Sequence, residues 1–190
     1  LLCAPYFASS VLATTAIMKV ASPAEQAELL PPLADGSCIA TLAFTEPNGK
    51  WDATGVELTA TAADGTYLLN GTKSFVLDGQ IANLLIVVAR EAGTQGEECL
   101  SFFHAATDAK GLLREKLAGM DATRKLSRLT FEDTPALPLG EIGQGAKALA
   151  ATLDLAAVAL ANEMVGGAQR LLADAVAYTK LRVQFGRTIG

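Results

Sequence analysis

Residues 56–73, with the sequence VELTATAADGTYLLNGTK, decide how this chain folds. Between residues 56 and 62 every second side chain is apolar and the others are polar, which is the pattern of a half-buried β-strand. Asp64-Gly65 then favours the two-residue turn of a β-hairpin, because both of its positions take a positive φ. Asn70-Gly71 is a second turn signal of the same kind. The stretch therefore predicts short strands that are joined by tight turns.

Further apolar runs on both sides of this stretch predict more strands. They cover residues 38–44, 73–77, 83–90, 100–104 and 126–131. Because turn signals separate many short strands, we expect an antiparallel β-barrel or sandwich over residues 35–138.

Both ends of the chain have the pattern of helices. Apolar residues recur at helical spacing within residues 1–34. Ser22-Pro23-Ala24-Glu25 carries the capping-box pattern of a helix start, and we expect Pro31-Pro32 to stop that helix. Residues 143–180 lack proline and are rich in Ala, Leu and Val, so they predict a long helix that is more than half buried in a bundle. The order of elements predicts an α+β fold.

The composition excludes several classes of protein. The 190 residues are 51% hydrophobic and 18% charged, which is not the composition of a disordered chain. The net charge of −5 and the lack of a basic patch argue against nucleic-acid binding. The longest apolar run, residues 84–89, is too short to cross a bilayer, so we expect no membrane insertion.

The cysteines and the chain ends lead to two further expectations. Cys3, Cys38 and Cys99 are widely spaced and form no CxxC pair, so we expect reduced thiols, no metal site and a cytoplasmic location. The chain starts without Met and ends directly after a long helical pattern, so we expect an internal segment of a larger protein.

A set of short segments follows in a fixed order along the chain. They are Phe44-Thr45-Glu46-Pro47, Leu69-Asn70-Gly71-Thr72-Lys73, Phe131-Glu132-Asp133-Thr134-Pro135 and Arg182-Val183-Gln184-Phe185-Gly186. With this order, the sequence resembles the acyl-CoA dehydrogenase family over essentially the whole chain. The resemblance implies that residues 1–34 end an N-terminal helical domain, residues 35–138 form the middle β-domain, and residues 139–190 are the first long helix of a C-terminal helical domain.

The resemblance implies an enzyme that carries FAD. In this family a carboxylate removes the proton alpha to the thioester carbonyl of an acyl-CoA, and flavin N5 accepts a hydride from the beta carbon. The product is a 2-enoyl-CoA, as in β-oxidation of fatty acids or steroid side chains, and an electron-transferring flavoprotein receives the electrons. The resemblance also implies a dimer or tetramer, either of one chain or heteromeric.

The resemblance places two groups of residues at the cofactor. The turn at Phe44 and Thr45 would face the isoalloxazine ring, where the Thr45 hydroxyl would hydrogen-bond the pyrimidine edge and favour the reduced flavin. The alternative is that Thr45 only caps the turn. Arg182 would bind the pyrophosphate of a neighbouring subunit's FAD through parallel hydrogen bonds, with Gln184 and Phe185 on the adenosine side. The alternative is a solvated Arg182 at a helix C-terminus, where the helix dipole favours cations.

The sequence departs from the family pattern at three other positions. Trp51 stands where the family has a serine that touches flavin, and it would either cover the flavin or fill the turn. Phe75 keeps an aromatic ring beside the flavin. Leu77 stands where the family has a threonine, and it offers no hydroxyl to N5.

A catalytic base is missing from the position that the family pattern allows within this segment. That position falls on Ala156, which has no proton-accepting group and is followed by Ala157. Glu163 lies two helical turns later on nearly the same face, and as a buried carboxylate it would act as the base. The alternative is that Glu163 pairs with Arg170. Two other kinds of protein stay open: a catalytically degenerate structural subunit of a heteromeric dehydrogenase, and an acyl-CoA oxidase-like enzyme.

Overall fold

The computed structural model describes residues 3–97 and 99–190. The chain divides into two compact units, one that ends at Leu155 and one that covers Ala156–Gly190. The first unit contains the β-sheet and the N-terminal helices, and the second contains most of a long helix and a short hairpin. The assignment of residues to three domains stays a prediction.

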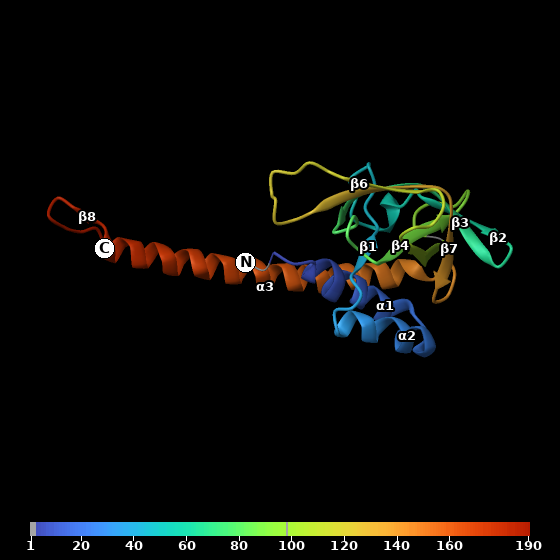
Figure 1. Ribbon diagram of the computed structural model, residues 1–190, viewed down its shortest axis with the longest axis horizontal. Coiled ribbons are helices and arrows are strands. Elements are labelled where there is room, and N and C mark those ends of the chain that lie inside the picture. The colour runs from blue at the N-terminus through green and yellow to red at the C-terminus, as the bar shows by residue number, and fades with distance from the viewer. Residues whose placement is uncertain (1–2, 98) are drawn as a thin grey trace. The chain divides into compact units, whose positions relative to one another are not determined.

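The first unit is built on a sheet that closes on itself. Its strands are β1 (Ala40–Ala43), β2 (Thr59–Ala63), β3 (Thr66–Leu77), β4 (Leu84–Glu91), β5 (Leu100–Ala106), β6 (Leu112–Lys116) and β7 (Leu126–Leu139). Pairing runs from β4 through β2, β3, β7 and β5 back to β4, while β1 lies beside β4 and β6 beside β7. The sheet is therefore a barrel of an α+β protein, as the sequence predicts (Figure 1).

The expectation of a purely antiparallel sheet is wrong. Strand β1 pairs with β4 in parallel, from Ala40 beside Leu84 to Ala43 beside Val87, and β2 also pairs with β4 in parallel. Parallel neighbours need a long connection. The chain between β1 and β4 is long enough because it contains the whole β2–β3 hairpin.

Only the first of the two predicted turns in this stretch exists. Asp64 and Gly65 both have positive φ and join β2 to β3, as predicted. The prediction of a turn at Asn70-Gly71 is wrong, because β3 continues through it with a register shift between Leu69 and Gly71. A Cβ at residue 71 would lie 3.0 Å from the Cα of Leu58, so this glycine allows a close approach of two backbones inside the sheet.

Strand β7 is longer than predicted and β6 was not predicted. The expected end at residue 131 is wrong, since β7 continues through Pro135 and Pro138 to Leu139. Strand β6 pairs with β7 only up to Phe131, so at Pro135 β7 pairs with β3 alone. The missing N–H of Pro135 therefore breaks no hydrogen bond to a second neighbouring strand. Three of the residues of β6 are charged, so its sequence lacks the apolar run by which the other strands were predicted.

The N-terminal part is helical, as expected. A π-helix (Phe7–Ala13) continues into α1 (Thr14–Val20), and α2 (Pro23–Ala34) follows. The Ser22–Glu25 capping box is present, because Ser22 N–H donates to Glu25 Oε2 at 2.7 Å and Glu25 N–H donates to Ser22 Oγ at 3.3 Å. The expected stop at Pro31-Pro32 is wrong: the helix includes both prolines, which cannot donate to the carbonyl groups one turn earlier, and it ends two residues later at Ala34.

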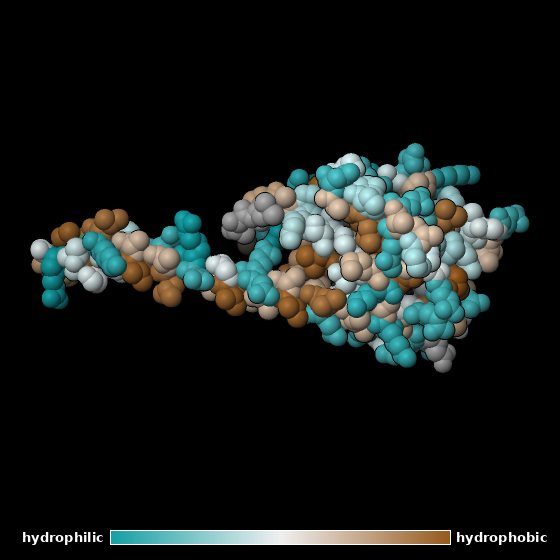
Figure 2. Space-filling model, turned by 90° about the horizontal axis from the view of Figure 1, so that it is seen from below, coloured by the Kyte–Doolittle hydropathy of each residue, from teal (hydrophilic) through white to brown (hydrophobic). Residues whose placement is uncertain are grey.

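Helix α3 (Gly145–Leu181) is followed by a hairpin of β8 (Val183–Gln184) and β9 (Arg187–Thr188). All side chains from residue 157 onwards are exposed or partly exposed within this chain, so the residues of this chain do not bury most of the helix, and its burial in a bundle stays a prediction. Figure 2 shows apolar side chains at its surface. By length and composition, α3 is also apolar enough to cross a membrane, with a mean hydropathy of 1.5 over its best 18-residue window, which the search for uninterrupted apolar runs missed.

Candidate functional site

The turn after β1 is tied to β3 by two hydrogen bonds. Ser74 N–H donates to the carbonyl oxygen of Thr45 at 2.9 Å, and the Thr45 hydroxyl donates to the carbonyl oxygen of Ser74. Thr45 is buried, as is Phe44 beside it. The hydroxyl proton of Thr45 therefore holds the turn in place, which is the structural role that the sequence left as an alternative.

The segment of β3 that receives these bonds is irregular. The register with β7 shifts between Lys73 and Val76, and Phe75 between them has a φ of 59°. This left-handed conformation is strained for a bulky residue, and such strain concentrates at functional positions. Phe75 is 55% exposed although Val76 beside it is buried. The bulge therefore turns an aromatic ring outward.

Trp51 and Leu77 lie close to the same turn and bulge. The Trp51 ring is 67% exposed and packs edge-to-face against Phe44, with ring centroids 6.0 Å apart. Trp51 thus both covers the turn and keeps a free face. Leu77 ends β3, and its carbonyl oxygen accepts a hydrogen bond from the Thr41 hydroxyl at 2.6 Å. The structure brings together the five predicted residues of this group: Phe44, Thr45, Trp51, Phe75 and Leu77.

A buried ion pair behind this surface was missed by the sequence analysis. Lys73 is fully buried, and its Nζ donates to Glu46 Oε1 at 2.7 Å and to the Phe44 carbonyl oxygen at 3.3 Å. The Glu46 carboxylate also accepts from the backbone N–H groups of Glu57 and Leu58, both at 2.9 Å. Burial lowers the pKa of Lys73 to about 8, against the opposing attraction of Glu46. Both residues lie in the quoted motifs, and a lysine inside the strand predicted at residues 73–77 was the available signal.

Arg90 is a second buried cation in this region. Its Nε donates to the carbonyl oxygen of Val56, and its Nη2 donates to those of Ala53 at 3.3 Å and Gly96 at 2.6 Å. The charge of Arg90 also contributes to lowering the pKa of Lys73. Glu46, Lys73 and Arg90 therefore fix the chain on both sides of Trp51.

The residues predicted to reach a neighbouring subunit lie in the second unit. Arg182 Nη1 donates to the Tyr178 hydroxyl at 2.5 Å, and its guanidinium lies 5.8 Å from the centre of that ring. Gln184 pairs with Arg187 in the hairpin, and Phe185 at the turn has a fully exposed side chain. These side chains are held at the surface with little shielding from solvent.

The Glu163 side chain is exposed in α3 within this chain, so its expected burial stays a prediction. Arg170, its expected alternative partner, forms an ion pair with Asp174 at 2.9 Å. Ala156 is buried and Ala157 is exposed. The structure therefore offers no shielded carboxylate at this part of α3.

The exposed faces of Trp51 and Phe75 fit a planar ring, since aromatic rings stack on flat conjugated systems. The side chains of this group leave no free hydroxyl for such a ring, because Thr45 donates to Ser74. Polar contacts to the ring would therefore come from backbone groups. Among the described residues, no group of three or more His, Cys, Asp or Glu side chains is placed so that it could hold a metal ion.

Comparison with known proteins gives consistent matches. Residues 41–134 match the model of the acyl-CoA dehydrogenase middle domain. The chain is 35% identical to a short-chain specific acyl-CoA dehydrogenase of Megasphaera elsdenii, over 94% of this chain and 48% of that protein. The chain thus spans about half the length of the curated relatives it matches.

Two solved structures extend this likeness to the fold. Butyryl-CoA dehydrogenase from Megasphaera elsdenii superposes with a TM-score of 0.90 at 33% identity, over 96% of this chain and 49% of that one. PigA, solved with FAD and proline, superposes with a TM-score of 0.89 at 28% identity, over 97% of this chain and 49% of that one.

Proposed function

Because this chain belongs to the acyl-CoA dehydrogenase family, we propose that the intact protein uses FAD to dehydrogenate an acyl-CoA thioester to a 2-enoyl-CoA. The observation that carries the proposal is the surface made by the turn after β1 and the bulge of β3. Two aromatic rings are exposed there, and a buried ion pair fixes the backbone beneath them. The relative named butyryl-CoA dehydrogenase and the FAD-loaded neighbour support the substrate class and the cofactor.

The residues of this chain have defined roles in the proposal. Trp51 and Phe75 stack on the flavin ring, and the turn at Thr45 presents backbone groups to its polar edge. Arg182 offers a planar fork of N–H donors that suits a pyrophosphate. FAD, when bound, supplies the two-electron oxidant for the beta carbon. Water is displaced from the aromatic surface, which strengthens the electrostatic contacts to the ring.

The proton on the alpha carbon needs a base, and we propose that this base lies outside the residues of this chain. Glu163 is the one candidate that the sequence analysis found, and the residues of this chain leave its side chain exposed in α3. A positioned base contributes roughly 100- to 10,000-fold to such a step, so its position decides the activity.

A specific observation favours a second candidate function, the catalytically degenerate subunit of a heteromeric dehydrogenase. Leu77 offers no hydroxyl and Ala156 no carboxylate. Such a subunit lends Arg182, Gln184 and Phe185 to the FAD of a neighbour. In both forms the protein is a dimer or tetramer, and an electron-transferring flavoprotein takes the electrons.

We propose a cytoplasmic protein without membrane insertion. The cysteines are free, as expected of a reducing compartment. The likeness to butyryl-CoA dehydrogenase covers 96% of this chain, so most of α3 has a counterpart in that fold. This likeness supports a helix that packs on other protein rather than one that crosses a bilayer.

The activity is tested with the intact protein, purified and reconstituted with FAD. Short, long and steroid-like acyl-CoA substrates are offered under anaerobic conditions with a dye as electron acceptor. The proposal expects enoyl-CoA formation with at least one of them. Because the proposed base lies outside this chain, the Glu163→Gln variant is expected to form enoyl-CoA at the same rate as the unchanged protein. Enoyl-CoA formation from none of them, with FAD bound, supports the degenerate subunit. A protein without flavin after reconstitution contradicts the dehydrogenase, and absence of flavin with any partner subunit present contradicts both.

A further inference from the structure

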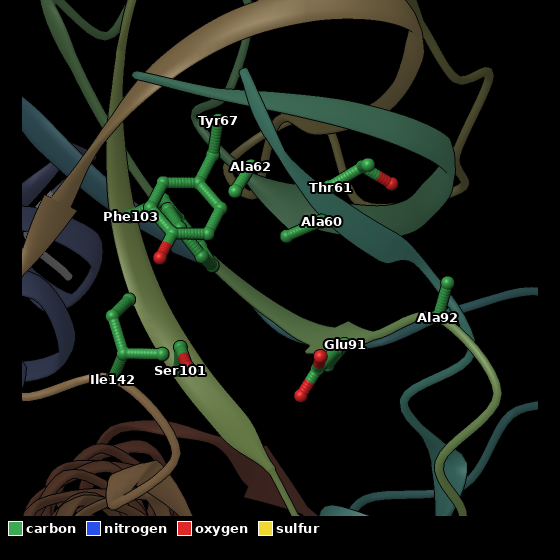
Figure 3. A pocket seen from close by; sticks show the side chains of 9 residues that line it. All are labelled: Ala60, Thr61, Ala62, Tyr67, Glu91, Ala92, Ser101, Phe103 and Ile142. Carbon is green, nitrogen blue, oxygen red and sulfur yellow. The ribbon is translucent and has the colours of Figure 1, made fainter. Parts of the chain in front are cut away.

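A pocket in the barrel is lined by nine residues, none of which belongs to the candidate site (Figure 3). Leu85, Val87 and Ala89 of β4 point into the core, and the alternation of the strand places Glu91 on the same inner face. In β5, Phe103 and Ala105 point inward, so Ser101 does too. The pocket therefore lies at the mouth of the barrel interior, where Glu91 and three other lining residues, Thr61, Ala62 and Ala92, are exposed.

Small side chains leave this mouth unfilled. Ala60, Ala62 and Ala92 line it, and the rings of Tyr67 and Phe103 form its floor with their centroids 5.0 Å apart. Strand β2 pairs with β4 only at Thr59 and Ala60, so the two strands separate beyond that point. The volume is about 380 Å³, which lies within the range of small-molecule sites.

The polar side chains of Tyr67, Glu91 and Ser101 line the pocket around this apolar floor. Figure 3 shows the Tyr67 hydroxyl and the Glu91 carboxylate reaching toward the same opening, with Ser101 and Ile142 beside it. Within the described part of the chain, no side chain pairs with the Glu91 carboxylate or the Tyr67 hydroxyl. Ser101 is 97% buried, and its Oγ accepts from Gly143 N–H at 2.8 Å, which leaves the second lone pair of this oxygen as an acceptor. One acidic and no basic residue lines the pocket.

We propose that this barrel-mouth pocket binds a small organic ammonium ion. The Glu91 carboxylate pairs with the charge, the Tyr67 and Ser101 oxygens accept its N–H groups, and the Tyr67–Phe103 floor covers its alkyl part. The phosphates of acyl-CoA and FAD are repelled by a pocket whose single charge is a carboxylate. The pocket is therefore a site separate from that of the proposed reaction, and the proposal does not depend on that reaction.

The test is calorimetric titration of the intact protein with n-butylammonium chloride, with n-butanol as the uncharged probe of the same length. Butylammonium is expected to bind about ten-fold or more tightly than butanol, because a hydrogen bond to a charged group is stronger than one between neutral groups. Glu91→Gln is expected to remove this preference. Glu115→Gln, which changes an exposed carboxylate on β6, is the matched control and is expected to bind as the unchanged protein does.

A second variant tests the pocket by its volume, without a change of charge. Ala62→Leu fills the mouth from a position that is exposed at the end of β2, so the barrel still folds, and butylammonium binding is expected to fall about ten-fold. Equal binding of butanol and butylammonium, no binding of either, or binding that Glu91→Gln leaves unchanged would overturn the proposal.

Discussion

The ammonium group of Lys73 lies 2.7 Å from the carboxylate of Glu46, and both side chains are out of contact with solvent. This pair joins the bulge of β3 to the turn after β1. The same carboxylate accepts the backbone N–H groups of Glu57 and Leu58, so it also holds the chain that leads into β2. Three segments that surround the exposed aromatic rings depend on one buried ion pair.

Removal of Lys73 alone is expected to be costly. Lys73→Met leaves the Glu46 carboxylate buried without its cation, which lowers the free energy of unfolding by about 3–5 kcal/mol. The double variant Glu46→Gln/Lys73→Met removes both charges and is expected to lose less than the single variant does. Urea unfolding followed by the fluorescence of Trp51, the one tryptophan of the chain, measures both.

The matched control is Lys110→Met, which removes an exposed lysine and is expected to change the free energy of unfolding by less than about 0.5 kcal/mol. A double variant that is as unstable as Lys73→Met, or less stable, would show that the pair does not act as a unit.

The low pKa of Lys73 has a consequence for the pH dependence of stability. Burial lowers this pKa from 10.5 to about 8 in the folded protein. Between these two values the unfolded chain binds more protons at this residue than the folded one, so the free energy of unfolding rises with pH. The slope contributed by Lys73 is at most about 1.4 kcal/mol per pH unit.

The measurement is urea unfolding at intervals between pH 8 and pH 10, for the unchanged protein and for Glu46→Gln/Lys73→Met. The difference between their free energies of unfolding is expected to grow with pH in favour of the unchanged protein. A difference that stays constant, or shrinks, would place the Lys73 pKa at its ordinary value.

Phe75 is expected to matter for FAD and little for folding. Its side chain is 55% exposed, so Phe75→Ala should change the free energy of unfolding by less than about 0.5 kcal/mol. Loss of a stacked ring costs about 0.5–1.5 kcal/mol, which corresponds to an FAD dissociation constant that is roughly two- to twelve-fold higher. Flavin fluorescence titration gives the constant. Leu113→Ala on β6, with an equally exposed side chain, should alter neither quantity, and unchanged FAD affinity in Phe75→Ala would exclude the stacking role.

Arg182 is expected to affect cofactor occupancy across subunits. Arg182→Ala should lower the FAD content of the purified protein without lowering the thermal stability of the barrel, because the side chain of Arg182 contacts Tyr178 of its own unit. Arg187→Ala, in the same hairpin, is the control for loss of charge. Full FAD content in Arg182→Ala, or a flavin-loaded monomer in sedimentation, would contradict a role at a neighbour's cofactor.

The sequence predicts the elements that local rules determine. The capping box at Ser22 and the turn at Asp64-Gly65 follow from adjacent residues, and both are present. Asn70-Gly71 has the same local signal but lies inside β3, because packing against Leu58 requires the glycine. Such close approaches between distant segments cannot be read from neighbouring residues.

In the candidate site, too, the local motifs could be predicted and the contacts between distant segments could not. The turn and bulge residues were found through motif order, and the structure brings Thr45 and Ser74 together. The role of Lys73 as partner of Glu46 was not found, because it needs the register of β3 against the turn after β1. The expected burial of Glu163 stays a prediction, since apolar neighbours on a helix do not by themselves supply a partner surface and the side chain is exposed within this chain.

Hydrogen–deuterium exchange of the intact protein, with and without FAD, tests most directly whether the turn after β1 and the bulge of β3 hold the cofactor. We expect FAD to slow exchange in residues 47–52 and 75–78, where side chains of Trp51 and Phe75 are exposed, and to leave the β2–β3 turn at Asp64-Gly65 unchanged. FAD binding that protects other segments of this chain and leaves these two unprotected would contradict the account.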